Sequence, residues 1–344
     1  MWLRTICAIS VCFSSWAQVG GQRSLEFLNI PTNARTAALG GVNVSLYDQD
    51  VNMFISNPAL LNADMSDHFS INYQAYLADI NNSTLSYAKN FEKYGLWGFG
   101  LRYFDYGDFE GYDATGAPTG EFGASEFAFM ISHSHSIGNF GLGGTLTLAH
   151  SSIASFGATA LMLDLGGTFI HPTRDWTLGL VIKNFGVLIS DYTDQSDSDL
   201  PFDVQLGTSF KPEHMPVRFS FTVYNLYQAD IAFFDPTGDG EPGKEEPSTV
   251  DKIFRHLNFG MEVILSKNFN LRGGYNHLLR RELRVQQNSG GAGFSFGFMF
   301  RIKAFEFAYT RNLYHPAGGT NYFTMTSNLG ALFKKKQIIQ EQNI

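Results

Sequence analysis

The sequence predicts an all-β protein: a transmembrane antiparallel β-barrel of about fourteen strands, with an N-terminal plug inside its lumen. Three observations lead to this prediction. Aromatic residues make up 15% of the chain, charged residues make up only 16%, and apolar residues recur at every second position through much of it. Ordinary soluble domains contain about 25% charged residues. Alternation with a period of two is typical of strands that present one apolar face, and we find no run of roughly 18 apolar residues that would indicate a membrane helix.

The first 17 residues are predicted to be a secretory signal peptide. Arg4 precedes an apolar run, and Ala17 ends a stretch that fits a signal-peptidase site. Both cysteines, Cys7 and Cys12, lie within this segment. We therefore expect a mature chain without cysteine, in which disulfides and thiol chemistry play no part. The formal net charge of −8 argues against nucleic acid as a partner.

Residues 18–67 are predicted to form the plug. The stretch from Leu25 to Leu61 is neither a clean strand nor a clean helix. A helical turn over 34–39 is stopped by two glycines, which allow positive φ, and an Asn-Pro pair then forces a turn. A small soluble subdomain is the alternative, and the strands that follow favour the plug. The residues singled out for the plug are Arg35, Gly40, Gly41, Asp48, Asp50, Asn57 and Pro58.

Fourteen alternating segments follow, and they predict a barrel over residues 68–333. They lie near 68–78, 83–92, 95–106, 122–136, 139–152, 157–171, 175–187, 201–211, 216–227, 254–266, 268–280, 290–302, 304–313 and 320–333. Connections after even-numbered strands are short, whereas those after odd-numbered strands include the long loops Gly107–Glu121, Leu188–Leu200 and Gln228–Ile253. This asymmetry is typical of outer-membrane barrels, while a soluble sandwich needs fewer strands. We expect both termini, including a tail over 334–344, on the periplasmic side with the short turns.

The polar faces of the strands carry charges that we expect to point into the lumen. An unpaired charge in a poorly hydrated interior is costly. Asp48 and Asp50 should therefore meet inward basic residues such as Arg102, Lys183, Arg218 or Arg272. Inward acidic residues should likewise face Arg35, and the candidates are Glu126, Asp164, Glu262 and Glu306.

The loop Gln228–Ile253 carries the candidate binding chemistry. Asp235, Thr237, Asp239 and Glu246 match the spacing of calcium ligands, with a glycine at the sixth position. Two prolines and the absence of flanking helices favour a solvated acidic loop over a metal site. An apolar anchor beside acidic residues suits a protein partner, so the predicted docking residues are Phe233, Phe234, Asp235, Asp239 and Glu241.

Other candidates have simpler explanations. His133 and His135 share one strand face, a spacing compatible with a metal ligand pair. No third ligand lies nearby in sequence, so polar residues at the membrane interface are favoured. Arg280, Arg281 and Arg284 either meet lipopolysaccharide or form a solvated loop tip. No catalytic residue and no cofactor are predicted.

The N-terminal block also resembles a known family. ARTAALGGVNVSLYDQD followed by NPALLN is similar to the amino-terminal pattern of the PorV/PorQ family, relatives of FadL-type fourteen-stranded barrels. VIKNFG at 181–186 and LPFDVQLG at 200–207 resemble it too, so the resemblance covers Ser24 to about Phe333. One feature departs from outer-membrane proteins generally, because the chain continues past Phe333 as KKKQIIQEQNI instead of ending on an aromatic residue.

The resemblance implies a non-catalytic component of the type IX secretion system, in an outer-membrane attachment complex with PorU, PorV and PorZ. The alternative is a FadL-like transporter of hydrophobic small molecules. Its discriminating feature is an apolar pocket in the lumen connected to a gap in the barrel wall. A hydrolase is disfavoured because no nucleophile and base are suitably placed.

Overall fold

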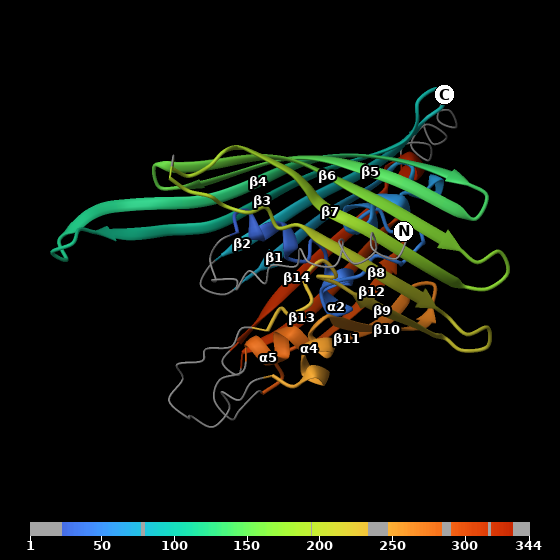
Figure 1. Ribbon diagram of the computed structural model, residues 1–344. Helices are drawn as coiled ribbons and strands as arrows, with labels where there is room; N and C mark the ends of the chain where they lie inside the picture. The colour runs from blue at the N-terminus through green and yellow to red at the C-terminus, as the bar shows by residue number, and fades with distance from the viewer. Residues whose placement is uncertain are drawn as a thin grey trace, which may run out of the picture.

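The computed structural model describes residues 23–76, 80–193, 195–232, 247–283, 290–315 and 318–332. Fourteen antiparallel strands close into one barrel in chain order, with β1 paired to β14 (Figure 1). The strands are β1 (His68–Ala75), β2 (Asn81–Phe91), β3 (Gly95–Tyr112), β4 (Pro118–Ile137), β5 (Phe140–Ile153), β6 (Phe156–Ile170), β7 (Trp176–Ser190), β8 (Asp203–Phe210), β9 (Val217–Val223), β10 (Leu257–Ser266), β11 (Phe269–Asn276), β12 (Phe294–Ile302), β13 (Phe305–His315) and β14 (Gly318–Asn328). Within the described residues no helix has the length and apolar character needed to cross a membrane.

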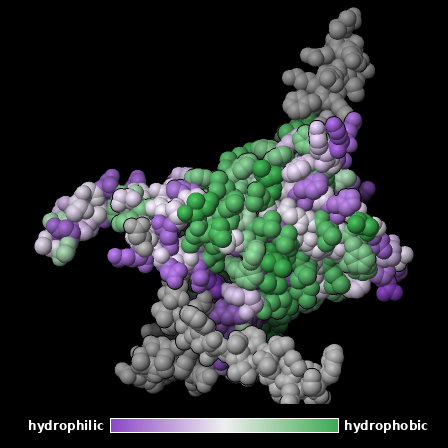
Figure 2. Space-filling view, turned by 45° about the horizontal axis from the view of Figure 1, so that its top comes forward, coloured by the Kyte–Doolittle hydropathy of each residue, from purple (hydrophilic) through white to green (hydrophobic). Residues whose placement is uncertain are grey.

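The predicted alternation of faces is confirmed along the barrel. On β1, the side chains of Ile71 and Tyr73 are about 40% exposed, whereas the alternate residues Ser70 and Asn72 are each at most 2% exposed. Figure 2 shows the result: hydrophobic residues gather in a broad band across the middle of the visible face, and hydrophilic residues gather at its ends. Such a band suits a barrel whose outer surface meets lipid.

Residues 23–67, which we call the luminal segment, lie inside the ring of strands. The segment holds α2 (Ala34–Ala38), α3 (Met53–Ser56) and three 3-10 turns, Glu26–Asn29, Pro58–Leu60 and Ala63–Met65. Thr310 on β13 donates a hydrogen bond to the Ala34 carbonyl, and Thr168 on β6 donates one to the Ala59 carbonyl. These two strands lie on opposite sides of the ring. The expectation that the segment acts as a plug, stopping passage, stays a prediction.

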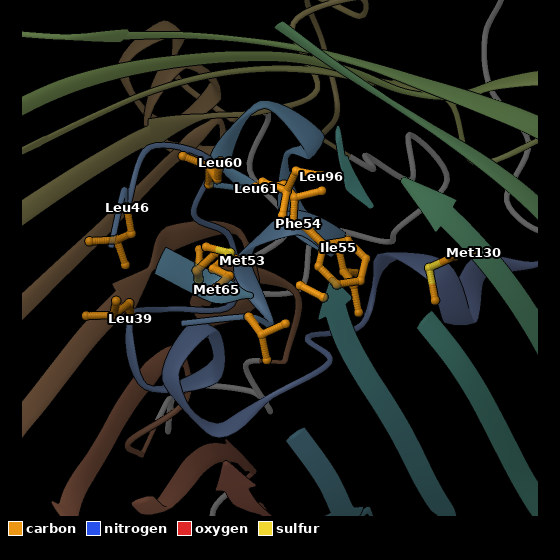
Figure 3. Close-up of a cluster of buried hydrophobic side chains, with 12 residues drawn as sticks. Leu39, Leu46, Met53, Phe54, Ile55, Leu60, Leu61, Met65, Leu96 and Met130 are labelled. Atoms are coloured by element: carbon orange, nitrogen blue, oxygen red, sulfur yellow. The ribbon is translucent and has the colours of Figure 1, made fainter. Parts of the chain in front are cut away.

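A buried hydrophobic cluster holds the luminal segment in place. Phe54, Leu60 and Met65 are fully buried in it, and Leu96 and Met130 reach in from β3 and β4 (Figure 3). Burying a side chain of this size stabilises a fold by roughly 1.5–3 kcal/mol. The cluster therefore anchors the segment to one wall of the barrel.

Gly40 and Asn57 fix the path of the luminal segment. Gly40 has a φ of +92°, and a Cβ there would overlap the Asn258 side chain from β10. Only glycine fits both constraints. Asn57 accepts a hydrogen bond from Ala59 N through its side chain and donates one to the Val44 carbonyl, at 2.9 Å. Pro58 begins the following 3-10 turn, as its fixed φ favours.

Several boundaries differ from the prediction. The supposed loop Gly107–Glu121 is mostly strand, because β3 and β4 pair as far as Tyr112 and Pro118. The last strand ends at Asn328 and not at Phe333. The next residue, Leu329, donates its N–H to the Asp67 carbonyl of the luminal segment. The helix α4 (Thr249–Arg255) lies mostly in the predicted loop Gln228–Ile253 and includes only the first two residues of the predicted tenth strand. The end of the predicted eleventh strand forms the helix α5 (His277–Glu282).

The first described residue does not lie on the short-turn side, where we predicted both termini. The described chain begins at Arg23, which forms a parallel bridge with Asp199 in the connection between β7 and β8. Ser24 N donates to the Asp199 carbonyl at 2.9 Å. That connection is on the long-loop side, so the luminal segment enters the barrel from there. The predicted signal peptide and the tail over 334–344 lie outside the described residues.

Candidate functional site

A balanced cluster of six charges joins the luminal segment to the wall. Arg35 contacts Asp48 at 2.7 Å, Asp50 at 3.3 Å and Glu262 at 2.9 Å. Two further arginines contact Glu262, namely Arg218 at 3.3 Å and Arg272 at 2.9 Å, and Arg218 also reaches Asp48 at 3.1 Å. Burial alone would raise the pKa of Asp48, but the Arg35 and Arg218 guanidiniums hold it well below its usual range.

The predicted pairings are thus partly confirmed. Asp48 meets Arg218, and Glu262 meets Arg35. The remaining candidates have other partners among the described residues: Lys183 donates to the Ile55 carbonyl, Glu126 accepts from Tyr106, Asp164 accepts from Asn184 N, Glu306 pairs with Arg301, and Arg102 donates to Asn82. The inward direction of these charges was predicted correctly, because alternation determines the face of each residue. Their partners depend on the path of the luminal segment, which alternation does not reveal.

Above this cluster, on the long-loop side, the lumen opens into an outer cavity of about 1090 Å³. Its apolar lining comes from the luminal segment, several strand ends and α5, and includes Phe27, Ile30, Tyr76, Tyr106, Leu279 and Tyr314. Its lining also contains polar groups, among them Lys183, Asp203 and Gln205. The mixture suits a ligand that has an apolar body and a polar end.

A second hollow, which we call the wall recess, lies where β7 separates from β8. The two strands pair only from Trp176 with Phe210 to Lys183 with Asp203, and the rest of β7 is not paired with a strand on that side among the described residues. The recess measures about 550 Å³ and is lined by Phe185, Leu188, Leu200, Phe202 and Tyr227, with Arg23 shared between the recess and the outer cavity. The two hollows therefore meet at one side chain.

A β-bulge on β7 sets the position of the recess. Lys183 and Asn184 together face Asp164 of β6, as the register shift between Leu163 and Leu165 shows. Asn184 has a φ of +55°, its N–H donates to Asp164, and its side chain donates to the Pro201 carbonyl. Bulges of this kind re-aim side chains and end regular pairing. Two adjacent polar residues interrupt the alternation here, which is the sequence signal that could have indicated the bulge.

The long-loop side also carries a small helical rim made of α4 and α5. Asp251 of α4 accepts hydrogen bonds from Arg255 and His277, each at 2.9 Å. It also forms an ion pair with Arg281 at 2.8 Å. Burial tends to raise the pKa of Asp251, but hydrogen bonds from His277 and Arg255 outweigh it and leave the pKa below its usual value. Arg281, predicted to meet lipopolysaccharide or solvent, therefore pairs within the protein.

The predicted docking residues cannot be placed on this surface. Phe233, Phe234, Asp235, Asp239 and Glu241, together with the weak calcium candidates Thr237 and Glu246, lie outside the described residues, as does Arg284. His133 packs against Trp97, with ring centroids 4.7 Å apart, and bonds to the Leu96 carbonyl. Its place at the membrane interface stays a prediction. In the described part of the chain no three His, Asp or Glu residues form a group that could hold a metal.

Comparison with known proteins supports the fold. No family model matches the sequence, and no curated protein matches it significantly. A ΔS2 mutant of the TodX monoaromatic hydrocarbon channel is 14% identical, with 86% of this chain and 97% of that chain covered and a TM-score of 0.50. A FadL homologue from Pseudomonas aeruginosa is 11% identical over 86% and 98% of the two chains, with a TM-score of 0.46.

At these identities the likeness shows the fold alone. The chain is a FadL-like, fourteen-stranded barrel of the outer-membrane type. The specific resemblance to the PorV/PorQ family has no counterpart among these matches and stays a prediction.

Proposed function

We propose that the protein admits a hydrophobic or amphiphilic small molecule into the outer half of its barrel. One observation carries this proposal: the outer cavity and the wall recess adjoin at Arg23. A transporter was expected to connect such a pocket to a gap in the wall, and the side chain of Arg23 stands where the two hollows come together. The similar TodX structure is described as a hydrocarbon channel, which supports the same ligand class. We expect passage beyond the cavity to require a shift of the luminal segment, because the charge cluster and the hydrophobic cluster tie that segment to the wall.

Ligand binding is tested with the full-length protein in lipid nanodiscs, titrated with the fluorescent apolar probe N-phenyl-1-naphthylamine. Ile30→Asp and Leu279→Asp place a charge in the cavity lining, and each should weaken probe binding about tenfold, or about 1.4 kcal/mol. Val250→Asp is the matched control, since Val250 is 64% exposed on α4 and does not line the cavity. No saturable binding above empty nanodiscs, or equal loss in the control, would refute the proposal.

A second candidate function is favoured by a different observation. The block from Ser24 to Leu61, with the runs at 181–186 and 200–207, resembles the type IX secretion family over almost the whole chain, and PorQ most closely within it. We infer from this resemblance a non-catalytic docking unit for a surface partner, which would be PorZ. Docking of this kind needs the long-loop side and not the cavity.

The docking candidate is tested by deleting residues 232–249, which include the predicted anchor Phe233 and Phe234. The deletion should leave an inserted barrel with heat-modifiable migration and should reduce the amount of co-purified partner. A calcium chelator should have a smaller effect, because we favour the non-metal explanation of Asp235–Glu246. Unchanged recovery of the partner by an inserted variant would exclude this loop as the docking site.

A further inference from the structure

The most prominent feature of the long-loop side is a two-stranded ribbon over residues 106–123, which we call the outer ribbon. β3 and β4 remain paired from Asp108 with Gly123 to Tyr112 with Pro118. β2 pairs with β3 only as far as Asp105, and β5 pairs with β4 only as far as Ala124. The ribbon therefore extends beyond the rest of the wall (Figure 1), and beyond its root both of its edges lack a partner strand among the described residues.

The outer ribbon has stabilising contacts of its own. At its tip, Asp113 accepts hydrogen bonds from Thr115 N at 2.8 Å and from Ala117 N at 2.9 Å. Phe109 and Phe122 stack across the two strands with ring centroids 5.5 Å apart. Isolated two-stranded hairpins are marginal in water, and these contacts supply the missing support. A surface that is already ordered loses less entropy when it binds a partner.

The charge of the ribbon has one sign. It carries Asp108, Glu110, Asp113 and Glu121, and the sequence contains no lysine or arginine from Tyr103 to Thr173. None of the four acidic residues forms an ion pair with another described residue. Hydrogen bonds from Thr115 and Ala117 lower the pKa of Asp113 below its usual value, which favours the charged carboxylate. The exposed Phe109 and Phe122 provide an apolar centre between these charges.

We propose that the outer ribbon is a docking arm for a second protein whose contacting strand is basic. A free strand edge offers backbone donors and acceptors in register, which a protein strand matches by β-augmentation and a lipid headgroup does not. The acidic side chains select a basic partner and repel anionic lipopolysaccharide. The stacked phenylalanines form the apolar anchor. This inference deepens the docking candidate above and does not depend on ligand binding in the outer cavity.

The test uses the full-length protein in the outer membrane of its producing cells. A photo-crosslinking residue is placed at Thr119 on the ribbon, with Ala154 in the exposed β5–β6 turn on the same side as the matched control position. We expect a protein adduct from Thr119 and not from Ala154. Mass spectrometry of the adduct should identify a partner peptide with a net positive charge. Combining Asp108→Asn, Glu110→Gln and Glu121→Gln in one variant should lower the adduct yield at least tenfold.

Several outcomes would overturn the proposal. These are adducts with lipopolysaccharide only, equal adducts from Ala154, a neutral or acidic partner peptide, an unchanged yield in the triple variant, or no adduct in a correctly inserted barrel. Probe binding by the outer cavity should be unaltered in the triple variant. Failure of the proposed ligand binding can therefore be distinguished from failure of docking by the outer ribbon. If deletion of residues 232–249 abolishes partner capture while the triple variant retains it, the docking function is supported and the proposed role of the outer ribbon is refuted.

Discussion

Arg35 connects the luminal segment to the barrel wall because its planar guanidinium offers five N–H donors in a fixed arrangement. Its three nitrogens donate to Asp48, Asp50 and Glu262, which come from two separate parts of the chain. Three arginines and three carboxylates balance one another in the interior, and a fourth carboxylate, that of the half-exposed Asp175, lies 3.7 Å from Arg218 at the edge of the cluster. Neutrality matters in this place, since a buried charge without a partner is expensive.

Replacing Arg35 by Met should destabilise docking of the luminal segment by roughly 3–5 kcal/mol, because Glu262 would lose its closest partner on the segment while remaining buried. Urea unfolding in lipid vesicles, with proteolysis of the luminal segment as a second readout, measures the change. Arg301→Met is the matched control, since the partly exposed Arg301–Glu306 pair should contribute only about 0–1 kcal/mol. Equal effects of the two substitutions would show that the cluster does not anchor the segment.

At the scale of elements, the apolar alternation predicted the strands and their faces well, because the membrane-facing side of a barrel tolerates few exceptions. Strand ends were predicted less well. β3 and β4 continue through glycines and acidic residues that usually indicate a loop, since cross-strand pairs such as Phe109 with Phe122 extend the ladder. The outer cavity could not be predicted, because its walls come from separate parts of the chain, among them the luminal segment, β3, β7, β8, β13 and α5.

The lipid-facing band predicts a sharp dependence on position. Phe296 on β12 and Tyr112 on the outer ribbon are 57% and 59% exposed, respectively, so only the surrounding medium distinguishes them. Phe296→Arg should cost roughly 2–4 kcal/mol if Phe296 lies near the bilayer midplane. Leu163→Arg should behave like Phe296→Arg, whereas Tyr112→Arg should cost little. Folding into lipid vesicles measures each value, and equal tolerance at both kinds of site would contradict the membrane band.

Ser295 precedes Phe296 on β12, and alternation predicts that its side chain points into the lumen. It is nevertheless a poor control for this experiment. It is buried and donates a hydrogen bond to the Ala38 carbonyl at 2.8 Å. An arginine there would displace α2, so its cost would report on the luminal segment and not on lipid.

The helical rim predicts a specific pH dependence. The pKa of Asp251 is lowered in the folded protein, while an unfolded aspartate titrates near pH 3.9. Its contribution to stability is therefore complete above about pH 4 and is lost as the pH falls through the folded pKa. Amide exchange over α4, corrected for intrinsic rates, should accelerate between pH 6 and pH 3. Asp251→Asn should lose protection at both pH values, and an identical pH response in this variant would rule out Asp251 as the cause.

At the scale of the whole molecule, the short turns differ in charge from the outer ribbon. The short turns carry Lys93, Arg174, Lys211, Lys267 and Lys303 beside the acidic Glu92, Asp175 and Glu213, whereas the outer ribbon carries only acidic residues. In barrels of this type the short turns face the periplasm and the longer connections face the exterior. The outer cavity, the wall recess and the outer ribbon would then all meet the cell exterior or the outer leaflet.

This orientation has a direct test, because the predicted mature chain contains no cysteine and each introduced thiol is unique. Ala117→Cys at the tip of the outer ribbon and Lys267→Cys in the short turn between β10 and β11 are both exposed positions. A polymer-coupled maleimide too large to cross the outer membrane should label Ala117→Cys in intact cells. It should label Lys267→Cys only after the membrane is disrupted, which also shows that this thiol is reactive. Labelling of Lys267→Cys in intact cells would reverse the orientation and would turn the outer cavity and the outer ribbon toward the periplasm.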